Sequence, residues 1–527
     1  MSFPCRHSTR VRQETPEREA GHFASKSRAA LAAAKVLSGV MGLLTMAGCA
    51  TVGPDYHPPE SSPPEKWSEA GNADSPVGEM TAATKWWTLF SDPTLNDLVE
   101  KAVAANHDLR IARARILQAR AQHLIARKNF GPTLDGSAGY TRERASINAD
   151  SSGGRVSPDS DLYQAGFDAA WEIDLFGKKR RAVEAARAEV SASEEMWGDT
   201  LVTLVGEVAR NFIEMRGLQQ RLVLARATIA TQEDALELAR VRFTAGLTSE
   251  LDVVQAVTLV TGTRSDLPTL EAQRQKSIHR LAVLLGREPG ALLAELSQDG
   301  PVPSAPPDVP VGLPADLLRR RPDVRAAERR LAAATAQIGV QTAELFPTFS
   351  LTGSAGLASA SMSNWWESGS RFWSFGPTVQ WRIFDAGRIR AAVRVKTALQ
   401  DEALADYEKT VLTSLQEVED ALVDYAKERV RHEALRERVA SAARAVELAS
   451  ELYRNGLTDF LNVLDARRSQ YQAEDLLAQS TQAVSTNLVA LYKALGGGWG
   501  AFAIPETERA VALKATTPTP FPHQALR

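Results

Sequence analysis

Few residues of this sequence are of a type and spacing that could carry out chemistry. Its eight histidines are scattered without metal-ligand spacing, and it has no Walker-type glycine loop, no Gly-x-Ser-x-Gly elbow and no His-Glu-x-x-His pair. Two cysteines, Cys5 and Cys49, are too few for a disulfide framework. The net charge of −3 gives no reason to expect a nucleic-acid partner. The sequence therefore predicts no enzyme, no cofactor and no metal site.

Cys49 is the residue whose surroundings predict a covalent modification. Residues 1–35 are basic, and an apolar run of small residues from Val36 to Gly48 leads directly to Cys49. This order is typical of a bacterial lipoprotein signal peptide over 1–48, and the apolar run is too short to span a membrane. We therefore expect Cys49 to carry diacylglycerol and palmitate, with Ala50 favouring the outer membrane. An ordinary signal peptide with an incidental cysteine is the alternative.

The longest regular stretch runs from Lys178 to about Leu285 and reads as two helices joined by a glycine turn. Apolar residues recur every seven positions along the first helix: Leu201, Val208, Met215, Leu222, Ile229, Leu236 and Phe243. That period marks a coiled-coil seam. The pattern returns 210 residues later as Val411, Val418, Tyr425, His432, Val439, Val446 and Tyr453. The chain therefore reads as a duplicated half-molecule with long coiled-coil helices in each copy.

Two matching turns end the long helices, and acidic residues follow both. The turns are Gly246-Leu247-Thr248 and Gly456-Leu457-Thr458. Gly246 suits a left-handed position after a helix, and Thr248 or Ser249 can cap the next helix. Asp252 then reads as a capping-box acid at that helix start. Asp465 lies further along its helix and reads as a charge on a solvated face.

Two segments change from a helical period to a period of two, beyond Pro132 and beyond Pro347. In the second, apolar or small residues on one face alternate with polar or small ones: Phe349, Leu351, Gly353, Ala355 and Leu357. Returning strands are expected over about 162–176 and 372–384. Four strands cannot close a barrel in lipid, so we expect three copies to supply twelve. A soluble α+β protein with two exposed hairpins is the alternative.

The expected organisation along the chain has six parts. They are a signal peptide (1–48), a lipid-anchored extended tether (49–88), a first repeat of helix, β-hairpin and long helices (89–298), a Pro-rich linker (299–313), a second repeat (314–500) and a disordered tail (501–527). Asp92 is expected to cap a helix that begins at Pro93. Pro268 is expected to kink or break the helix in which it lies.

Together these features resemble the outer-membrane efflux proteins of the TolC superfamily, and within it the NodT-type, OprM-like lipoproteins of RND efflux systems. The matching stretches are Val52-Gly53-Pro54-Asp55-Tyr56, Trp171 to Gly177, Leu317 to Arg325, Phe346-Pro347 and Leu461 to Ala466. The resemblance covers about residues 49–500. It implies a mostly α fold with a membrane β-barrel part: a TolC-like homotrimer with a twelve-stranded barrel and a long coiled-coil α-barrel that forms a periplasmic tunnel.

The resemblance also implies functional positions. In the resembling proteins the tunnel narrows to a periplasmic gate at positions that match Asp252, Leu461, Asn462, Asp465 and Arg468. The two Gly-Leu-Thr turns match the tip on which adaptor hairpins dock. Asn462 stands where some relatives have a second acid, and Thr458 stands where some have a basic residue. These departures favour a gate made of a Leu ring and an Asp ring over a salt-bridge latch, and the sequence leaves both open.

The resemblance implies an outer-membrane exit duct of a tripartite RND-type efflux system that exports small molecules such as drugs or toxic compounds. Its partners would be a periplasmic adaptor (membrane fusion) protein, an inner-membrane RND transporter and outer-membrane lipid. One alternative is the outer-membrane duct of a type I protein-secretion system, and another is a structural coiled-coil protein without a pore. The sequence identifies neither the exported substrates nor the particular pump.

Overall fold

The computed structural model describes residues 51–59, 64, 67–68, 80–144, 159–304, 317 and 319–502. They form two compact units. The sheet unit consists mainly of residues 134–178 and 346–382, and the helical unit contains most of the rest. The expected signal peptide, Cys49, and most of the expected linker and tail lie outside the described residues.

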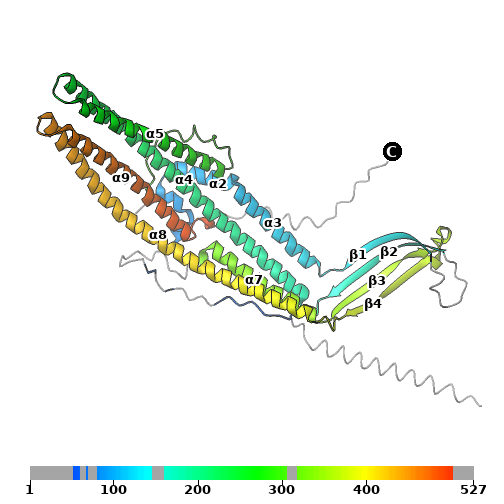
Figure 1. The fold of residues 1–527 in the computed structure, drawn as a ribbon. Helices are drawn as coiled ribbons and strands as arrows, with labels where there is room; N and C mark the ends of the chain where they lie inside the picture. Colours follow the sequence, from blue (N-terminus) through cyan, green and yellow to red (C-terminus); the bar gives the residue numbers. More distant parts are fainter. Residues whose placement is uncertain are drawn as a thin grey trace, which may run out of the picture. The chain divides into compact units, whose positions relative to one another are not determined.

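The sheet unit contains a four-stranded sheet in the order β1-β2-β3-β4 (Figure 1). The strands are β1 (Thr133–Arg144), β2 (Asp159–Ile173), β3 (Thr348–Ser359) and β4 (Arg371–Gln380). β2 pairs antiparallel with β3, and β3 pairs antiparallel with β4. The two hairpins expected from the sequence thus lie side by side, and β1 and β4 are the outer strands. Short 3-10 turns, η4 (Met362–Asn364) and η5 (Ser368–Ser370), connect β3 to β4.

The strand register gives the sheet one apolar face and one polar face. Directly opposed residues share a face, because side chains alternate along each strand. The apolar face carries rows such as Phe167, Ala355 and Trp373, or Ile173, Phe349 and Val379. The opposite face carries Asp168, Ser354 and Ser374, and the Ser354 and Ser374 hydroxyls are hydrogen-bonded at 2.8 Å. The alternation predicted from the sequence is confirmed, with Trp373 80% and Phe375 70% exposed on the apolar face.

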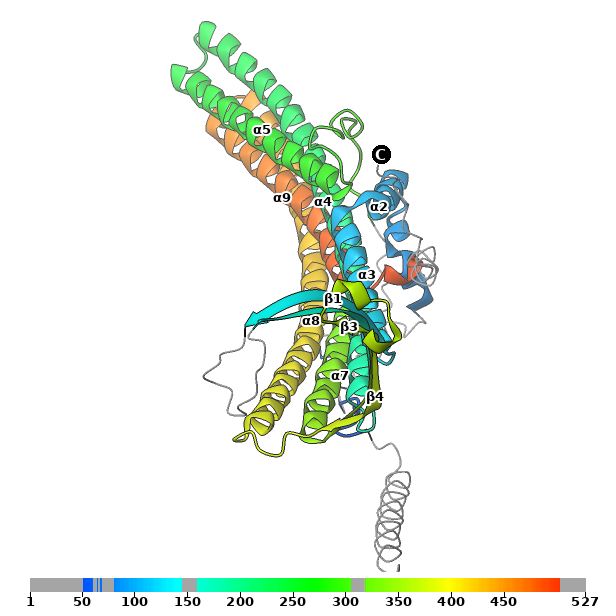
Figure 2. The same cartoon turned by 90° about the vertical axis from the view of Figure 1, so that its right-hand side faces the viewer.

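Two pairs of long helices make up most of the helical unit. α4 (Lys178–Thr244) and α8 (Arg388–Arg454) each have 67 residues, which corresponds to about 100 Å of helix. α5 (Glu250–Leu284) and α9 (Phe460–Ala494) each have 35 residues. Figures 1 and 2 show α5 beside α4 and α9 beside α8. The equal lengths fit the duplication read from the sequence.

Shorter helices begin at capping residues. Asp92 caps α2 (Pro93–Ala105), and its carboxylate accepts the N–H groups of Thr94 and Leu95 at 2.8 and 3.1 Å, as predicted. Asn106 caps α3 (His107–Lys128) in the same way. α7 (Pro322–Thr342) begins with proline and leads into η3 (Ala343–Leu345).

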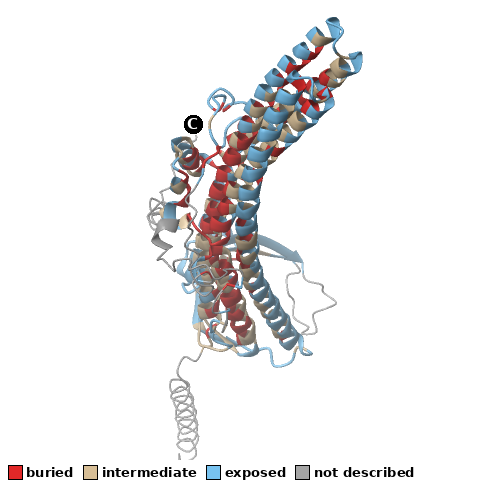
Figure 3. Cartoon of the chain, turned by 90° about the vertical axis from the view of Figure 1, so that its left-hand side faces the viewer, coloured by how far each residue is buried: buried red, intermediate tan, exposed pale blue. Residues whose placement is uncertain are grey.

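The main hydrophobic core lies along the inside of the helical unit (Figure 3). Most of the predicted seam of α4 is buried: Leu201, Val208, Met215, Leu222, Ile229 and Leu236. Phe243, next to the turn, is 43% exposed. The matching seam of α8 is buried less completely in the single chain, although Val418, Tyr425 and Tyr453 are buried.

The N-terminal segment is more structured than the predicted extended tether. η1 (Met80–Phe90) is helical, and its Trp86 and Trp87 are buried in the main core. Trp86 stacks on Tyr492 with ring centroids 5.4 Å apart, and Trp87 stacks on Phe502, which follows η6 (Trp499–Ala501). The large aromatic area buried here explains the difference, because it stabilises a segment whose composition alone favours an extended chain.

Pro268 does not break α5, which is continuous from Glu250 to Leu284, so of the predicted kink or break the break is wrong. Packing against neighbouring helices can offset the free-energy cost of a proline inside a helix. None of the helices within the described residues is both long and apolar enough to cross a lipid bilayer.

Candidate functional site

The predicted tip residues form two turns of the same geometry. Gly246 and Gly456 both have φ of +72°, a left-handed conformation that glycine adopts without strain. In each turn the residue after the glycine donates its N–H to a carbonyl five residues earlier at 2.9 Å: Leu247 to Arg242 and Leu457 to Leu452. Each turn is thus a Schellman motif that satisfies the helix end. At the start of the next helix in each copy, the N-cap residue makes no side-chain capping hydrogen bond; these residues are Ser249 and Asp459.

The predicted gate residues Asp252 and Asn462 occupy equivalent positions and make equivalent contacts. The Thr248 hydroxyl donates a hydrogen bond to the Asp252 carboxylate. In the second copy the Asn462 amide donates to the Thr458 hydroxyl at 2.7 Å. Each side chain therefore ties the start of its helix to the preceding turn, with donor and acceptor exchanged. Asp252 lies in the first turn of α5, and its bond with the Thr248 hydroxyl is not the reciprocal pair of hydrogen bonds of the predicted capping box, since Ser249 makes no side-chain cap.

The remaining predicted gate residues lie on one exposed face of α9. Leu461, Asp465 and Arg468 follow one another at intervals of four and three, which places them on one side of a helix. Leu461 is 50% exposed. Arg468 and Asp465 form an ion pair of 3.4 Å whose side chains are 56% and 57% exposed, so solvent weakens it.

The opposite face of α9 packs into a small core, here called the tip core. Its buried members come from all four long helices: Ala235, Leu236, Ala239, Ala256, Val260, Tyr453, Phe460, Val463 and Leu464. The Phe460 and Tyr453 rings lie 5.1 Å apart. The tip core therefore holds the first-copy turn and the second-copy turn together.

Arg242 joins the two tips, and the sequence alone did not identify it as a functional residue. Its guanidinium donates to the Tyr453 backbone carbonyl at 3.2 Å and lies 4.4 Å from the centre of the Tyr453 ring. Burial raises the pKa of the Tyr453 hydroxyl, and the positive charge of Arg242 opposes that rise. Arg242 lies in the last turn of α4 and Tyr453 in the last turn of α8, so this contact links the two copies next to their turns.

Leu251 is a second residue that sequence reasoning missed. It is the first-copy equivalent of Leu461 and is 62% exposed. The offset of 210 residues could have identified it. No such signal pointed to Arg242, because its partner Tyr453 is distant in sequence.

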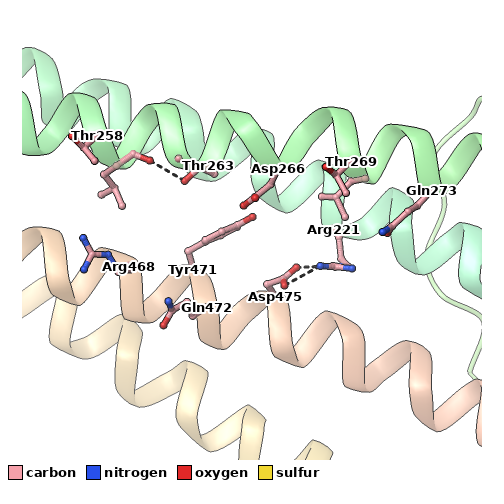
Figure 4. A pocket seen from close by; sticks show the side chains of 13 residues that line it. Arg221, Thr258, Thr263, Asp266, Thr269, Gln273, Arg468, Tyr471, Gln472 and Asp475 are labelled. Carbon is pink, nitrogen blue, oxygen red and sulfur yellow. Dashed lines mark hydrogen bonds and ion pairs between the residues drawn. The ribbon is translucent and has the colours of Figure 1, made fainter.

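A polar cavity of about 550 Å³ lies further along α5 and α9 from the tip core. Arg221 of α4 and Asp475 of α9 form a two-contact ion pair at its wall, with distances of 2.7 and 3.1 Å. The Tyr471 hydroxyl points toward the Asp266 carboxylate (Figure 4). Burial raises the pKa of Tyr471 to about 12, helped by the negative charges of Asp475 and Asp266. The phenol therefore stays protonated at neutral pH.

Within the part of the chain that the structure describes, no three or more His, Cys, Asp or Glu residues are grouped so as to hold a metal ion. The tips have a packed inner side, the tip core, and an exposed side that carries Leu461, Asp465 and Arg468.

Comparison with known proteins gives the family and the fold of the chain. The sequence model of the family described as "Outer membrane efflux protein" matches residues 98–287 and 313–497. The chain is 36% identical over 464 residues to Outer membrane protein OprJ of Pseudomonas aeruginosa, covering 88% of this chain and 96% of OprJ. It is 32% identical over 458 residues to Nodulation protein T of Rhizobium leguminosarum biovar trifolii, covering 86% and 96%.

A solved structure of the outer-membrane channel OprN has the same fold. It matches with a TM-score of 0.80 and 38% identity, covering 85% of this chain and 100% of that chain. The two stretches matched by the family model include all four strands and all four long helices. The chain therefore belongs to the outer membrane efflux protein family, and it is a non-enzymatic channel of the bacterial outer membrane with a helical periplasmic tunnel.

Proposed function

We propose that three copies of this chain form the exit duct of a tripartite RND-type efflux system. The duct would receive small molecules such as drugs or toxic compounds from an inner-membrane RND transporter through a periplasmic adaptor. The observation that carries the proposal is a sheet with one apolar face, one polar face and two outer strands. Such a sheet is incomplete alone, because unpaired backbone groups at its edges cannot lie in lipid.

The dimensions of the sheet suit a membrane. Along β2 the apolar face runs from Tyr163 to Ile173, about ten steps of about 3.4 Å, or about 34 Å. At a strand tilt of about 40° this corresponds to about 26 Å, close to the apolar band of about 25 Å in outer-membrane sheets. Three copies would close a twelve-stranded sheet, with β4 of one copy beside β1 of the next.

Exposed apolar residues on the helices support the same assembly. α8 exposes Val395, Leu412 and Val430, which are 58%, 68% and 70% accessible in the single chain. α3 exposes Ile111 and Ile125, at 51% and 61%. These residues lie one by one along the helices, and burying each of them against a neighbouring copy would be favourable. We assign them to contacts between neighbouring copies, since closure of the sheet already requires such neighbours.

We assign the gate to the exposed face of α9, with Leu461 and Asp465 facing the pore axis. Three-fold symmetry would bring three Asp465 carboxylates together, and their repulsion would favour opening unless cations or packing offset it. Arg468, at 3.4 Å from Asp465 in the same chain, supplies part of that compensation. The weak, solvent-exposed pair supports a ring gate over a salt-bridge latch. Asp252 and Asn462 would hold the neighbouring turns in place.

We assign the two turns to adaptor docking. Leu247 and Leu457 are 68% and 72% exposed at the ends of the helical hairpins. Exposed leucines on rigid turns are suited to insertion into an apolar groove of a partner. The left-handed glycines Gly246 and Gly456 fix the turn geometry, and the hydroxyls of Thr248 and Thr458 tie the turns to Asp252 and Asn462 of the next helices.

We also propose that Cys49 carries the lipid anchor. Two residues later the chain is attached to the sheet unit: Thr51 lies against Gly177, and the Val52 N–H donates to the Phe176 carbonyl at 3.1 Å. An acyl group at Cys49 would therefore lie close to the sheet. Mass spectrometry of the purified protein tests this directly. We expect the added mass of a diacylglycerol and an acyl chain, which Cys49→Ala abolishes.

Single-channel recording in planar bilayers tests the duct and the gate. We expect the wild-type channel to be closed most of the time and cation-preferring, because carboxylates line its narrowest point. Leu461→Ala with Asp465→Ala should raise the closed-state conductance and reduce the cation preference. The matched control is Leu293→Ala with Glu288→Ala, an exposed pair outside the tips. Unchanged closed-state conductance in the gate variant would contradict the gate assignment.

A further inference from the structure

The two junctions between a β-hairpin and the following long helix differ between the copies. The first junction leads from β2 into α4 and the second leads from β4 into α8, and positions 210 residues apart correspond. Phe384 stands where the first copy has Asp174, and Arg394 stands where it has Glu184. The second copy has thus exchanged two acidic residues for an aromatic and a basic residue, although the elements on either side of the junction are the same.

The first junction is covered by other parts of its own chain. The Val52 N–H donates to the Phe176 carbonyl at 3.1 Å, and the Phe176 ring stacks on Phe346 with ring centroids 4.7 Å apart. Glu184 pairs with the buried Arg181 at 2.9 Å, so an acid and a cation balance each other there. The first junction is therefore closed by contacts within one chain.

The second junction presents two apolar side chains, here called the apolar pair. They are Ile383 and Phe384, which are 81% and 87% exposed. The Asp385 carboxylate accepts the N–H groups of Gly387 and Ile389 at 2.9 and 2.8 Å, and the Ile389 side chain is buried. The loop is thus fixed to the start of α8 and holds the apolar pair outward, where burial against another surface would be favourable.

Three arginines follow the apolar pair without acidic partners. Arg388, Arg390 and Arg394 are exposed, and none of them forms an ion pair with a residue that the structure describes. No acidic residue occurs between Asp385 and Asp401. Cations in the first turn of a helix oppose its dipole, and the like charges of Arg390 and Arg394, four residues apart, repel each other. This arrangement lowers the stability of α8 alone, and anions outside the chain would offset that cost.

An anionic phospholipid surface fits both features. Its acyl chains can bury the apolar pair, and its phosphates can accept hydrogen bonds from guanidinium groups, often two at a time. The junction directly follows β4, whose apolar face suits lipid. A neighbouring copy fits less well. The helix that would lie next to the junction is α3 of that copy, which leads into β1 and ends in Arg127 and Lys128, so like charges would meet.

We propose that the second junction, residues 383–394, is a membrane anchor. The apolar pair inserts among the acyl chains of the leaflet that faces the periplasm, and the three arginines bind the phosphates of anionic headgroups. This leaflet is the nearer one because the junction leads from the membrane sheet into the periplasmic helices. The inference rests on the outer-membrane location of the chain and on the assignment of the apolar sheet face to lipid. It does not depend on the proposed gate or cargo.

A spin label in reconstituted vesicles tests the apolar pair. The label replaces Phe384 in the full-length protein, in vesicles of phosphatidylglycerol and phosphatidylethanolamine, and a control label replaces Leu293, which is 38% exposed outside the junctions. We expect molecular oxygen, which dissolves in acyl chains, to reach the Phe384 label more readily than a water-soluble nickel chelate, and the reverse at Leu293. Protection of the Phe384 label from both reagents would mean that a neighbouring copy covers the junction. Access for the nickel chelate alone would mean that water does, and either result overturns the anchor.

Lipid binding measured by native mass spectrometry tests the arginines. Arg388→Gln with Arg390→Gln is compared with the matched control Lys427→Gln with Arg438→Gln, two exposed cations further along α8. We expect the wild type and the control to bind phosphatidylglycerol more tightly than the neutral phosphatidylcholine. In the junction variant the affinity for phosphatidylglycerol should fall about 30-fold, which corresponds to about 2 kcal/mol for two arginines at an anionic surface.

An unchanged affinity for phosphatidylglycerol in the junction variant, or an equal loss in the control, would overturn the role of the arginines. Failure of the wild type to conduct ions would instead contradict the proposed duct, and the two lipid measurements would still decide on the anchor.

Discussion

Asn106 and Arg321 hold the same place in the two copies and make the same contact by different chemistry. The Asn106 side-chain amide donates to the Leu284 carbonyl at 2.9 Å, and the Arg321 guanidinium donates to the Ala494 carbonyl at 2.9 Å. Each precedes a short helix and binds the end of a 35-residue helix. The second copy has replaced a neutral amide by a buried cation, which Asp323 and Glu417 neutralise at 2.6 and 2.7 Å.

Arg321→Ala should destabilise the helical unit by about 2–4 kcal/mol, because it removes a buried charged donor and leaves two carboxylates without their partner. Thermal unfolding followed by circular dichroism measures the effect. Arg319→Ala, an exposed arginine two residues away, is the control and should change stability by less than about 0.5 kcal/mol. Equal effects of the two substitutions would show that the contacts of the Arg321 guanidinium add nothing specific to the stability of the helical unit.

Phe375→Lys should prevent stable insertion into the outer membrane. Phe375 lies midway along the apolar face opposite Gly353, where a lysine costs about 2–4 kcal/mol in lipid. Ser374→Lys places the same charge on the polar face one residue away and should be tolerated. Fractionation of membranes and resistance of the assembly to heat in detergent measure both. Similar loss for both variants would contradict the assignment of the faces.

Leu247→Asp with Leu457→Asp should weaken adaptor binding about tenfold or more, as loss of an apolar anchor does at an interface hot spot. Conductance in bilayers should be unchanged, since neither leucine lies on the proposed gate face. Leu293→Asp is the control. Binding of the purified adaptor to the reconstituted duct is the measurement, and undiminished binding would move the docking surface elsewhere.

Tyr492 gives the helical unit a predictable dependence on alkaline pH. Burial raises its pKa to about 12, above the ordinary value of 10. Between pH 10 and 12 the Tyr492 hydroxyl is therefore protonated in the folded state and ionised in the unfolded state. The contribution of Tyr492 to the free energy of unfolding is complete below pH 10 and is lost between pH 10 and 12. In Tyr492→Phe, the loss of unfolding free energy at alkaline pH should be smaller by up to about 2.7 kcal/mol. Urea titrations at pH 8 and pH 11 compare the variant with the wild type, and parallel pH profiles would contradict the burial argument.

The elements with local signals could be predicted from the sequence. The seven-residue period located α4 and α8, alternation located β3, and Gly246 and Gly456 marked the turns. Asp92 was identified because a helix start depends on neighbouring residues alone. The prediction that three copies close the sheet followed from the same local alternation, because the number of strands in one chain is too small.

Contacts between distant parts of the chain could not be read from the sequence. Arg242 and Tyr453 meet only because two hairpins lie side by side, and nothing in the spacing of either indicates the other. Most of η1 was assigned to an extended tether that ended at residue 88, because its stabilisation comes from Tyr492 and Phe502 at the far end of the chain. Continuity of α5 through Pro268 likewise depends on its neighbours. The spacing of Leu461, Asp465 and Arg468 is consistent with one face of α9, while the gate role of these residues stays a prediction.

The central claim is that one chain cannot close the pore and three can. Native mass spectrometry of the full-length protein, extracted in a mild detergent that keeps the helices folded, counts the chains in each particle directly. We predict three chains per particle, with no stable particle of one chain. A folded particle that contains a single chain would contradict the account, because the outer strands β1 and β4 would then have no partner.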